Sequence, residues 1–218
     1  MKLNKVLIAS IFVILLVFVV TLIFYSKLPQ KIATHWDEKG EVNGYMSRFW
    51  GAFIIPFMFV GLFLLFLAIP YIDPLGKNIQ AFKNYYDIFI LLFVIFMASI
   101  QMQTLLWNVG VKINPLIFVS VGSGLLFYYI GVLLKNAKRN WFIGIRTPWT
   151  LSSDAVWEKT HNLGSILFKI SGILCLVGFF FQKFEIYFVI LPLSFTAVYT
   201  VIYSYIAYRK EVSNGNRK

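Results

Sequence analysis

Two histidines have the widest chemical repertoire in this chain, because a neutral imidazole can bind a metal ion or move a proton near neutral pH. His35 is followed by Asp37 and Glu38, and Glu158 lies three residues before His161. A structural zinc site needs about four ligands and a catalytic site about three. The transmembrane topology that the sequence predicts places His35 outside and His161 inside the membrane. The two histidines therefore cannot share a metal ion, and we predict no metal site and no cofactor.

His161 and Glu158 could instead act as an acid–base pair on a lipid headgroup, which would make the protein an interfacial lipid-modifying enzyme. Such chemistry requires a general base within hydrogen-bond reach of a substrate proton. The sequence contains no His-Glu-x-x-His, no phosphate-binding glycine loop and no Gly-x-Ser-x-Gly elbow. We therefore expect a protein that is not an enzyme, with the lipid-modifying activity as an alternative.

The polar segment 135–162 contains the second histidine and interrupts long apolar runs. It holds three of the six Trp and five of the twenty Lys and Arg residues. Its stretch WFIGI is apolar enough to dip into the membrane interface, and RTPW reads as a turn. A helix capped by Thr150 or Ser152 is expected to follow, with Asp154 in its first turn, and to continue into the next apolar run.

This segment allows two interpretations. The expected helix places Trp157 and His161 on one face, at a spacing of four residues. The segment is then either an amphipathic linker with Trp anchors at headgroup level or a docking platform, because aromatic and Arg side chains dominate binding hot spots. Composition does not separate the two.

Six apolar runs position these polar segments. The chain of 218 residues is 59% hydrophobic and 13% charged, which leaves too few charges to cover a water-facing surface. Continuous runs of about 20 apolar residues predict transmembrane helices. The sequence thus predicts an all-α integral membrane protein, a bundle of six transmembrane helices with a short structured outer loop and an interfacial cytoplasmic loop-helix. The runs are Val6–Tyr25, Gly51–Ile72, Ile88–Trp107, Pro115–Leu134, Leu163–Phe181 and Ile186–Tyr208.

We expect one membrane domain over residues 1–218, with the first run as an uncleaved anchor. Its parts are 1–134 with four helices and the outer loop 26–50, the cytoplasmic segment 135–162, the last two helices within 163–208, and the polar tail 209–218.

Lysine and arginine set the expected orientation. Thirteen lie on the side of both termini and the segment 135–162, and six lie on the other side. The positive-inside rule therefore places both termini in the cytoplasm. A basic inner face beside anionic lipids accounts for the net charge of +11, so no direct nucleic-acid binding is expected. Lys169, inside the fifth run, can extend its ammonium to the inner headgroups.

Polar side chains cluster in the third run, where Ser99 and Gln103 share a helix face and Gln101 and Asn108 lie nearby. Hydrogen bonds between helices are the favoured interpretation. A polar ligand path is the alternative, and it would fit a transporter of a small or lipid-like substrate.

The outer loop 26–50 contains an alternating stretch, KIATHW, and two turn signals, DEKG and NG. We expect a short extended segment with tight turns that caps the outer face of the bundle, with a plain solvated connector as the alternative. Its candidate binding residues are His35, Trp36, Gly40, Asn43 and Gly44.

Two stretches resemble a known family. Residues 140–161, NWFIGIRTPWTLSSDAVWEKTH, closely resemble the signature of the SdpI family of membrane proteins, and residues 28–45, LPQKIATHWDEKGEVNGY, resemble the domain of unknown function at that family's N-terminal end. The signature positions carried over as candidate partner-binding residues are Asn140, Gly144, Arg146, Pro148, Trp149, Trp157 and His161.

The resemblance implies a prokaryotic cytoplasmic-membrane protein that confers immunity to a secreted toxin peptide. It also implies a receptor that sequesters a transcriptional repressor at the membrane. The family offers no catalytic residues to carry over. The lipid bilayer, a toxin peptide outside and a repressor at the cytoplasmic face are therefore the expected partners.

Overall fold

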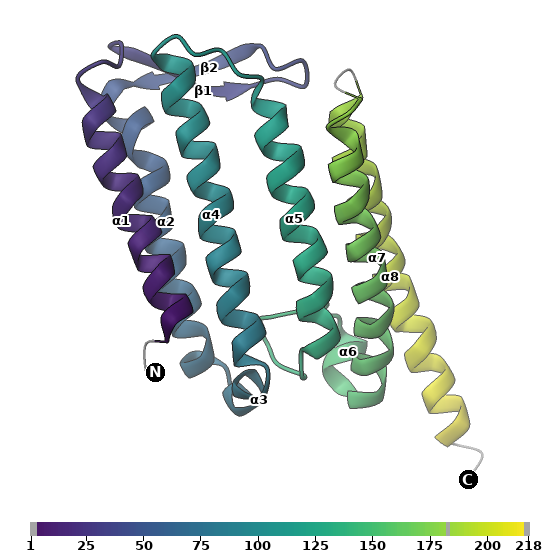
Figure 1. Ribbon diagram of the computed structural model, residues 1–218. Coiled ribbons are helices and arrows are strands. Elements are labelled where there is room, and N and C mark those ends of the chain that lie inside the picture. The colour runs from purple at the N-terminus through teal and green to yellow at the C-terminus, as the bar shows by residue number, and fades with distance from the viewer. Residues whose placement is uncertain (1–3, 182–183, 216–218) are drawn as a thin grey trace.

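The computed structural model describes residues 4–181 and 184–215 and is almost entirely helical (Figure 1). Within these residues, six helices are long and apolar enough to cross a membrane, so the protein is an all-α multi-pass membrane protein, as the sequence predicts. These helices are α1 (Lys5–Tyr25), α2 (Arg48–Ile72), α4 (Lys83–Asn108), α5 (Pro115–Asn136), α7 (Asp154–Gly178) and α8 (Glu185–Gly215).

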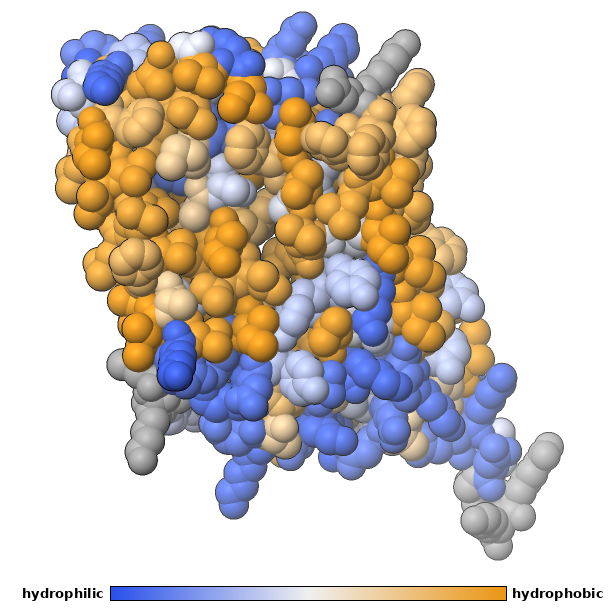
Figure 2. All heavy atoms as spheres, in the orientation of Figure 1, coloured by the Kyte–Doolittle hydropathy of each residue, from blue (hydrophilic) through white to orange (hydrophobic). Residues whose placement is uncertain are grey.

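Four short elements lie at the two ends of the bundle. Strands β1 (Lys31–Trp36) and β2 (Val42–Ser47) pair antiparallel as a hairpin at one end. Helices α3 (Gly76–Ala81) and α6 (Pro148–Ser152) lie at the other end, with the start of α1 and the end of α8 (Figure 1). Figure 2 shows an apolar band between two polar ends, as expected for a protein that spans a bilayer.

The helices form two groups joined by α5. Helix α4 packs against α1, α2 and α5, whereas α5 packs closely on α7, and α7 on α8. Glycines allow the close approach of α5 and α7. A Cβ on Gly131 would lie 2.6 Å from the carbonyl oxygen of Ser165, and one on Gly124 would lie 3.0 Å from that of Gly172. Small residues commonly line helix contacts in membranes, where no hydrophobic effect drives association.

The third transmembrane helix begins earlier than the apolar run predicts, at Lys83 rather than Ile88. Its first turns are stabilised by polar contacts, which hydropathy does not reveal. The carboxylate of Asp87, 1% exposed, pairs with the Lys83 ammonium one turn earlier and accepts a 2.6 Å hydrogen bond from the Asn4 amide. Asn4 also caps α1, because its Oδ1 accepts the backbone N–H of Leu7.

Polar side chains of α4 connect helices, which confirms the favoured interpretation of this run for Gln101. Its amide donates to Thr21 Oγ1 of α1 at 3.1 Å and to the carbonyl oxygen of Ala52 of α2 at 2.9 Å. Ser99 does not make such a bond between helices, since its hydroxyl donates to the carbonyl of Phe96 in the same helix. Gln101 therefore links three helices within the apolar band.

Candidate functional site

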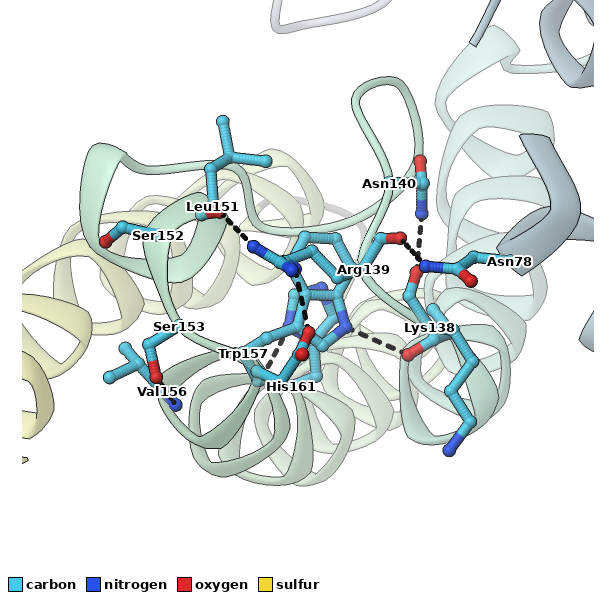
Figure 3. A network of polar contacts seen from close by, with 12 residues as sticks. Asn78, Lys138, Arg139, Asn140, Leu151, Ser152, Ser153, Val156, Trp157 and His161 are labelled. Carbon is cyan, nitrogen blue, oxygen red and sulfur yellow. Dashed lines mark hydrogen bonds and ion pairs between the residues drawn. The ribbon is translucent and has the colours of Figure 1, made fainter. Parts of the chain in front are cut away.

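The segment 135–162 folds back against the end of α2, α3 and α8 rather than forming a simple connection. Figure 3 shows part of its network of polar contacts. Asn140 organises its first part and is fully buried. The Asn140 amide donates to the carbonyls of Lys138 and Ile143, at 2.8 and 2.9 Å, and its Oδ1 accepts the N–H groups of Phe142 and Ile143, at 2.9 and 2.6 Å. One side chain thus satisfies four groups and fixes the turn that presents WFIGI.

Gly144 and His161 meet at the next turn. Gly144 has φ +116°, a conformation that other residues rarely adopt, and a Cβ there would lie 2.4 Å from His161 Nε2. The N–H of Ile145 donates to the same Nε2 at 3.1 Å, and Nδ1 lies 2.9 Å from the carbonyl oxygen of Trp157. Because Nε2 accepts and Nδ1 faces an acceptor, His161 is a neutral imidazole with its proton on Nδ1.

Trp157 is the largest buried side chain of the segment, with 3% of its surface exposed. Its ring stacks on the His161 ring with centroids 3.9 Å apart, and its Nε1 donates to the carbonyl of Ala137 at 2.9 Å. The N-terminal turns of α7 are thereby joined to the C-terminal end of α5. Together with half-buried Gly144, the buried residues Asn140, Trp157 and His161 form one cluster, which we call the signature lock.

A second set of contacts, around Arg139, was not predicted from the sequence. Its Nη1 donates to the carbonyl of Leu151 at 2.7 Å, and its Nε lies 2.7 Å from Asp154 Oδ1. The carbonyl of Arg139 accepts the Asn78 amide at 2.7 Å, and Asp73, buried at the end of α2, accepts the N–H of Trp141 at 2.8 Å. Arg139 therefore lies among protein partners.

The predicted helix cap was wrong, because the segment forms two helices rather than one. Thr147 caps α6 in a capping box with Thr150, and Ser153 caps α7 by accepting the N–H of Val156. The side chains of these two capping residues also contact α8. Thr147 Oγ1 donates to Ser204 Oγ at 3.0 Å, and the Ser153 hydroxyl lies 2.9 Å from the Glu211 carboxylate oxygens.

The other signature residues lie outside the lock. Arg146 is exposed, and its Nη1 donates to the carbonyl of Trp141 at 2.8 Å. Pro148 is exposed at the first position of α6. Trp149 packs on Tyr205 of α8, with ring centroids 5.1 Å apart. The candidate residues thus divide into the signature lock, Trp149 packed on α8, and the exposed pair Arg146 and Pro148.

A polar cavity of about 550 Å³ lies beside the lock. Glu158 and His161 both line it, yet both His161 ring nitrogens are bound to the backbone and its ring is 2% exposed. Such a ring cannot exchange a proton with a substrate unless the lock opens. In the part of the chain that the structure describes, no group of three His, Cys, Asp or Glu side chains could hold a metal ion.

The outer candidate residues shape the hairpin. His35 Nδ1 lies 2.5 Å from Asn43 Oδ1 across the two strands, and a Cβ on Gly44 would lie 2.9 Å from the His35 Cβ. Gly40 has φ +76° in the connecting turn. Trp36 packs edge-on against Trp107 of α4, with centroids 5.6 Å apart. The predicted extended segment is present and pairs with a second strand, and the predicted DEKG turn connects the two strands. The second predicted turn was wrong, because Asn43 and Gly44 lie within β2.

Asn108 fixes this hairpin to the bundle. Its Oδ1 accepts the N–H of Ala33 at 2.8 Å, and its amide donates to the Ala33 carbonyl at 2.9 Å. The side chain therefore replaces a strand partner for β1 at a register irregularity next to Ala33. In the sequence, Asn108 lies among the polar side chains of the third run, for which hydrogen bonds between helices are the favoured interpretation. In the structure Asn108 holds the outer hairpin.

The chain is an all-α multi-pass membrane protein, and its two structured polar segments lie in regions that match known protein families. Residues 136–204 match the model of the SdpI/YfhL protein family, and residues 12–60 match a domain of unknown function, DUF1648. The resemblance to the SdpI family that the sequence predicts is thereby confirmed. The chain is also similar to the immunity protein SdpI of Bacillus subtilis (strain 168), with 28% identity over 211 residues, covering 96% of this chain and 98% of that protein. No solved structure matches the chain.

Proposed function

We propose that this chain is an SdpI-like immunity protein that protects its own membrane against a secreted toxin peptide. The observation that carries the proposal is the extent of the similarity to the Bacillus immunity protein, which spans 96% of this chain and 98% of that protein. A shared fragment would support only a shared fold element. The backbone-bound state of His161 favours a role without catalysis.

The outer hairpin is the surface we propose for the toxin peptide. Around it lie exposed apolar side chains, with Tyr45 63%, Phe49 47% and Trp50 57% exposed. Aromatic side chains at the bilayer boundary suit an amphipathic peptide that approaches along the membrane. The hairpin residues His35, Trp36, Gly40, Asn43 and Gly44 would hold this surface in shape.

A toxin-sensitive bacterial strain that expresses this chain should survive doses of secreted toxin peptide that kill the same strain with an empty vector. Survival curves measure the protection. A variant with Ala at Tyr45 and Phe49 should protect less well, whereas Lys77→Ala, at the opposite end, should protect normally. Equal survival with and without the chain, at verified membrane expression, would refute the immunity role.

For the opposite face, we propose that Arg146 and Pro148 contact a cytoplasmic regulator such as a transcriptional repressor. Both are exposed, whereas the signature residues of the lock are used internally. Arg146→Ala should leave stability within about 0.5 kcal/mol of the parent, as for most surface substitutions. It should reduce the amount of repressor that co-purifies with the membrane fraction, whereas Lys138→Ala, also exposed and basic, should not. If the Arg146→Ala variant recruits as much repressor as the parent, Arg146 does not contact this regulator.

We propose that both termini lie in the cytoplasm, because the end that carries α3, α6 and the termini is the more basic one. A reporter that fluoresces only in the cytoplasm, fused after residue 218, should be bright. A reporter active only outside, inserted between Glu38 and Lys39 of the hairpin turn, should be active. The opposite pair of signals would reverse the topology and exchange the two proposed binding faces.

A further inference from the structure

A second cavity, of about 410 Å³, lies between the ends of α5, α7 and α8 next to the polar cavity. Three lysines line it, and no carboxylate does. Its lining is Lys135, Lys159, Asn162, Leu163, Ser165, Ile166, Lys169 and Tyr203. We name it the lysine cavity.

The charge of the lysine cavity is not neutralised within the described residues. Among the described residues, the ion pairs between side chains are Lys83–Asp87 and Arg139–Asp154, and neither involves a lysine of this cavity. The Lys135 ammonium donates to the neutral amide of Asn162 at 2.8 Å. Since three lysines and no carboxylate line this cavity, an anion is the ligand that electrostatics favours.

The position of the cavity indicates which kind of anion. Lys159 and Lys169 are ten residues apart on α7, about 15 Å along the helix axis. Between them, Ile166 is 58% exposed, so the cavity runs from the polar end of the bundle into the lipid-facing surface. Figure 2 shows hydrophilic side chains that extend from this end into the apolar band over α5 and α7. A ligand that matches both parts has an anionic head and an apolar chain.

Packing restricts the deepest lysine. A Cβ on Gly131 of α5 would lie 2.7 Å from Lys169 Cγ, so the stem of Lys169 runs directly over the backbone of α5. A glycine at this position gives the lysine room, and the contact limits its rotamers. Less side-chain entropy is then lost when the ammonium binds a phosphate.

We propose that the lysine cavity binds one anionic phospholipid, with its phosphate between Lys135, Lys159 and Lys169 and an acyl chain along Leu163 and Ile166. This site is independent of the immunity role, since neither the hairpin nor the exposed Arg146 takes part. A lipid bound there would join α5, α7 and α8 at their polar end.

The test uses the full chain in nanodiscs of phosphatidylcholine, with or without phosphatidylglycerol, and counts retained lipids by native mass spectrometry. The parent should retain one phosphatidylglycerol. Lys159→Gln with Lys169→Gln should lower its apparent affinity at least tenfold, since each lysine near anionic lipid contributes about fivefold. Lys159→Arg with Lys169→Arg should retain it.

The matched control is Lys77→Gln with Lys210→Gln, which removes the same charge from exposed positions at the same end of the bundle. This variant should bind phosphatidylglycerol like the parent. Equal losses in both double variants would overturn the site in favour of general attraction to the surface. Displacement of the lipid by millimolar inorganic phosphate would also overturn it, because the acyl chain would then contribute nothing.

Discussion

Gly144→Ala should be among the most damaging single-methyl additions in this protein. The backbone at φ +116° disfavours any side chain, which costs about 1–3 kcal/mol. The added Cβ would also approach His161 Nε2 to 2.4 Å, and the His161 ring cannot retreat because it stacks on Trp157. We expect a loss of about 3 kcal/mol or more in the free energy of unfolding, measured by denaturation in detergent micelles.

Gly110→Ala separates the two causes. Gly110 also has a positive φ, +103°, but an added Cβ there meets no atom within 4 Å. Gly110→Ala should therefore show the backbone cost alone. If both variants lose the same stability, the contact with His161 contributes nothing and the lock is looser than the structure indicates.

Trp157→Ala should have a comparably large effect for a different reason. Removal of a buried Trp costs about 3–5 kcal/mol through lost burial and the remaining cavity. The carbonyl of Ala137 would also lose its hydrogen-bond donor, and the His161 ring its stacking partner. The same denaturation experiment should show an early transition, together with loss of protection against toxin because the segment no longer folds.

Two variants calibrate this result. Trp157→Phe keeps an aromatic ring but removes the indole N–H, so it should lose less stability than Trp157→Ala. Trp141→Ala removes a Trp from the same segment where the side chain is 51% exposed, and should cost little. A large loss in Trp141→Ala with a small one in Trp157→Ala would reverse the roles assigned to the two rings.

Hydropathy and spacing predicted the six helices, since a continuous apolar run has few other structures available in lipid. They also predicted a turn followed by a helix between residues 140 and 162. The position of the cap could not be predicted, because Thr150, Ser152 and Ser153 are all acceptable caps locally. Ser153 is selected in the context of a carboxylate fifty-eight positions later in the chain, at Glu211.

Long-range polar contacts were missed for the same reason. Asp73 lies at the end of α2 and Asn78 in the six-residue helix α3, which is too short to show a sequence periodicity. Their partners, at Trp141 and Arg139, are more than sixty residues away. The structure bears on whether the segment 135–162 is a membrane-anchored linker or a docking platform for a partner. Asn140, Trp157 and His161 use their polar atoms inside the protein, whereas Arg146 keeps an exposed side chain that a partner can reach.

The hydroxyls of Thr147 and Ser153 have a consequence for biosynthesis. Their partners, Ser204 and Glu211, belong to the last helix, so the loop between α5 and α7 gains these bonds only after that helix has been translated and inserted. Chains fold progressively during synthesis, N-terminal parts first. A nascent chain with five inserted helices therefore carries an incomplete signature segment, and the sixth helix completes it.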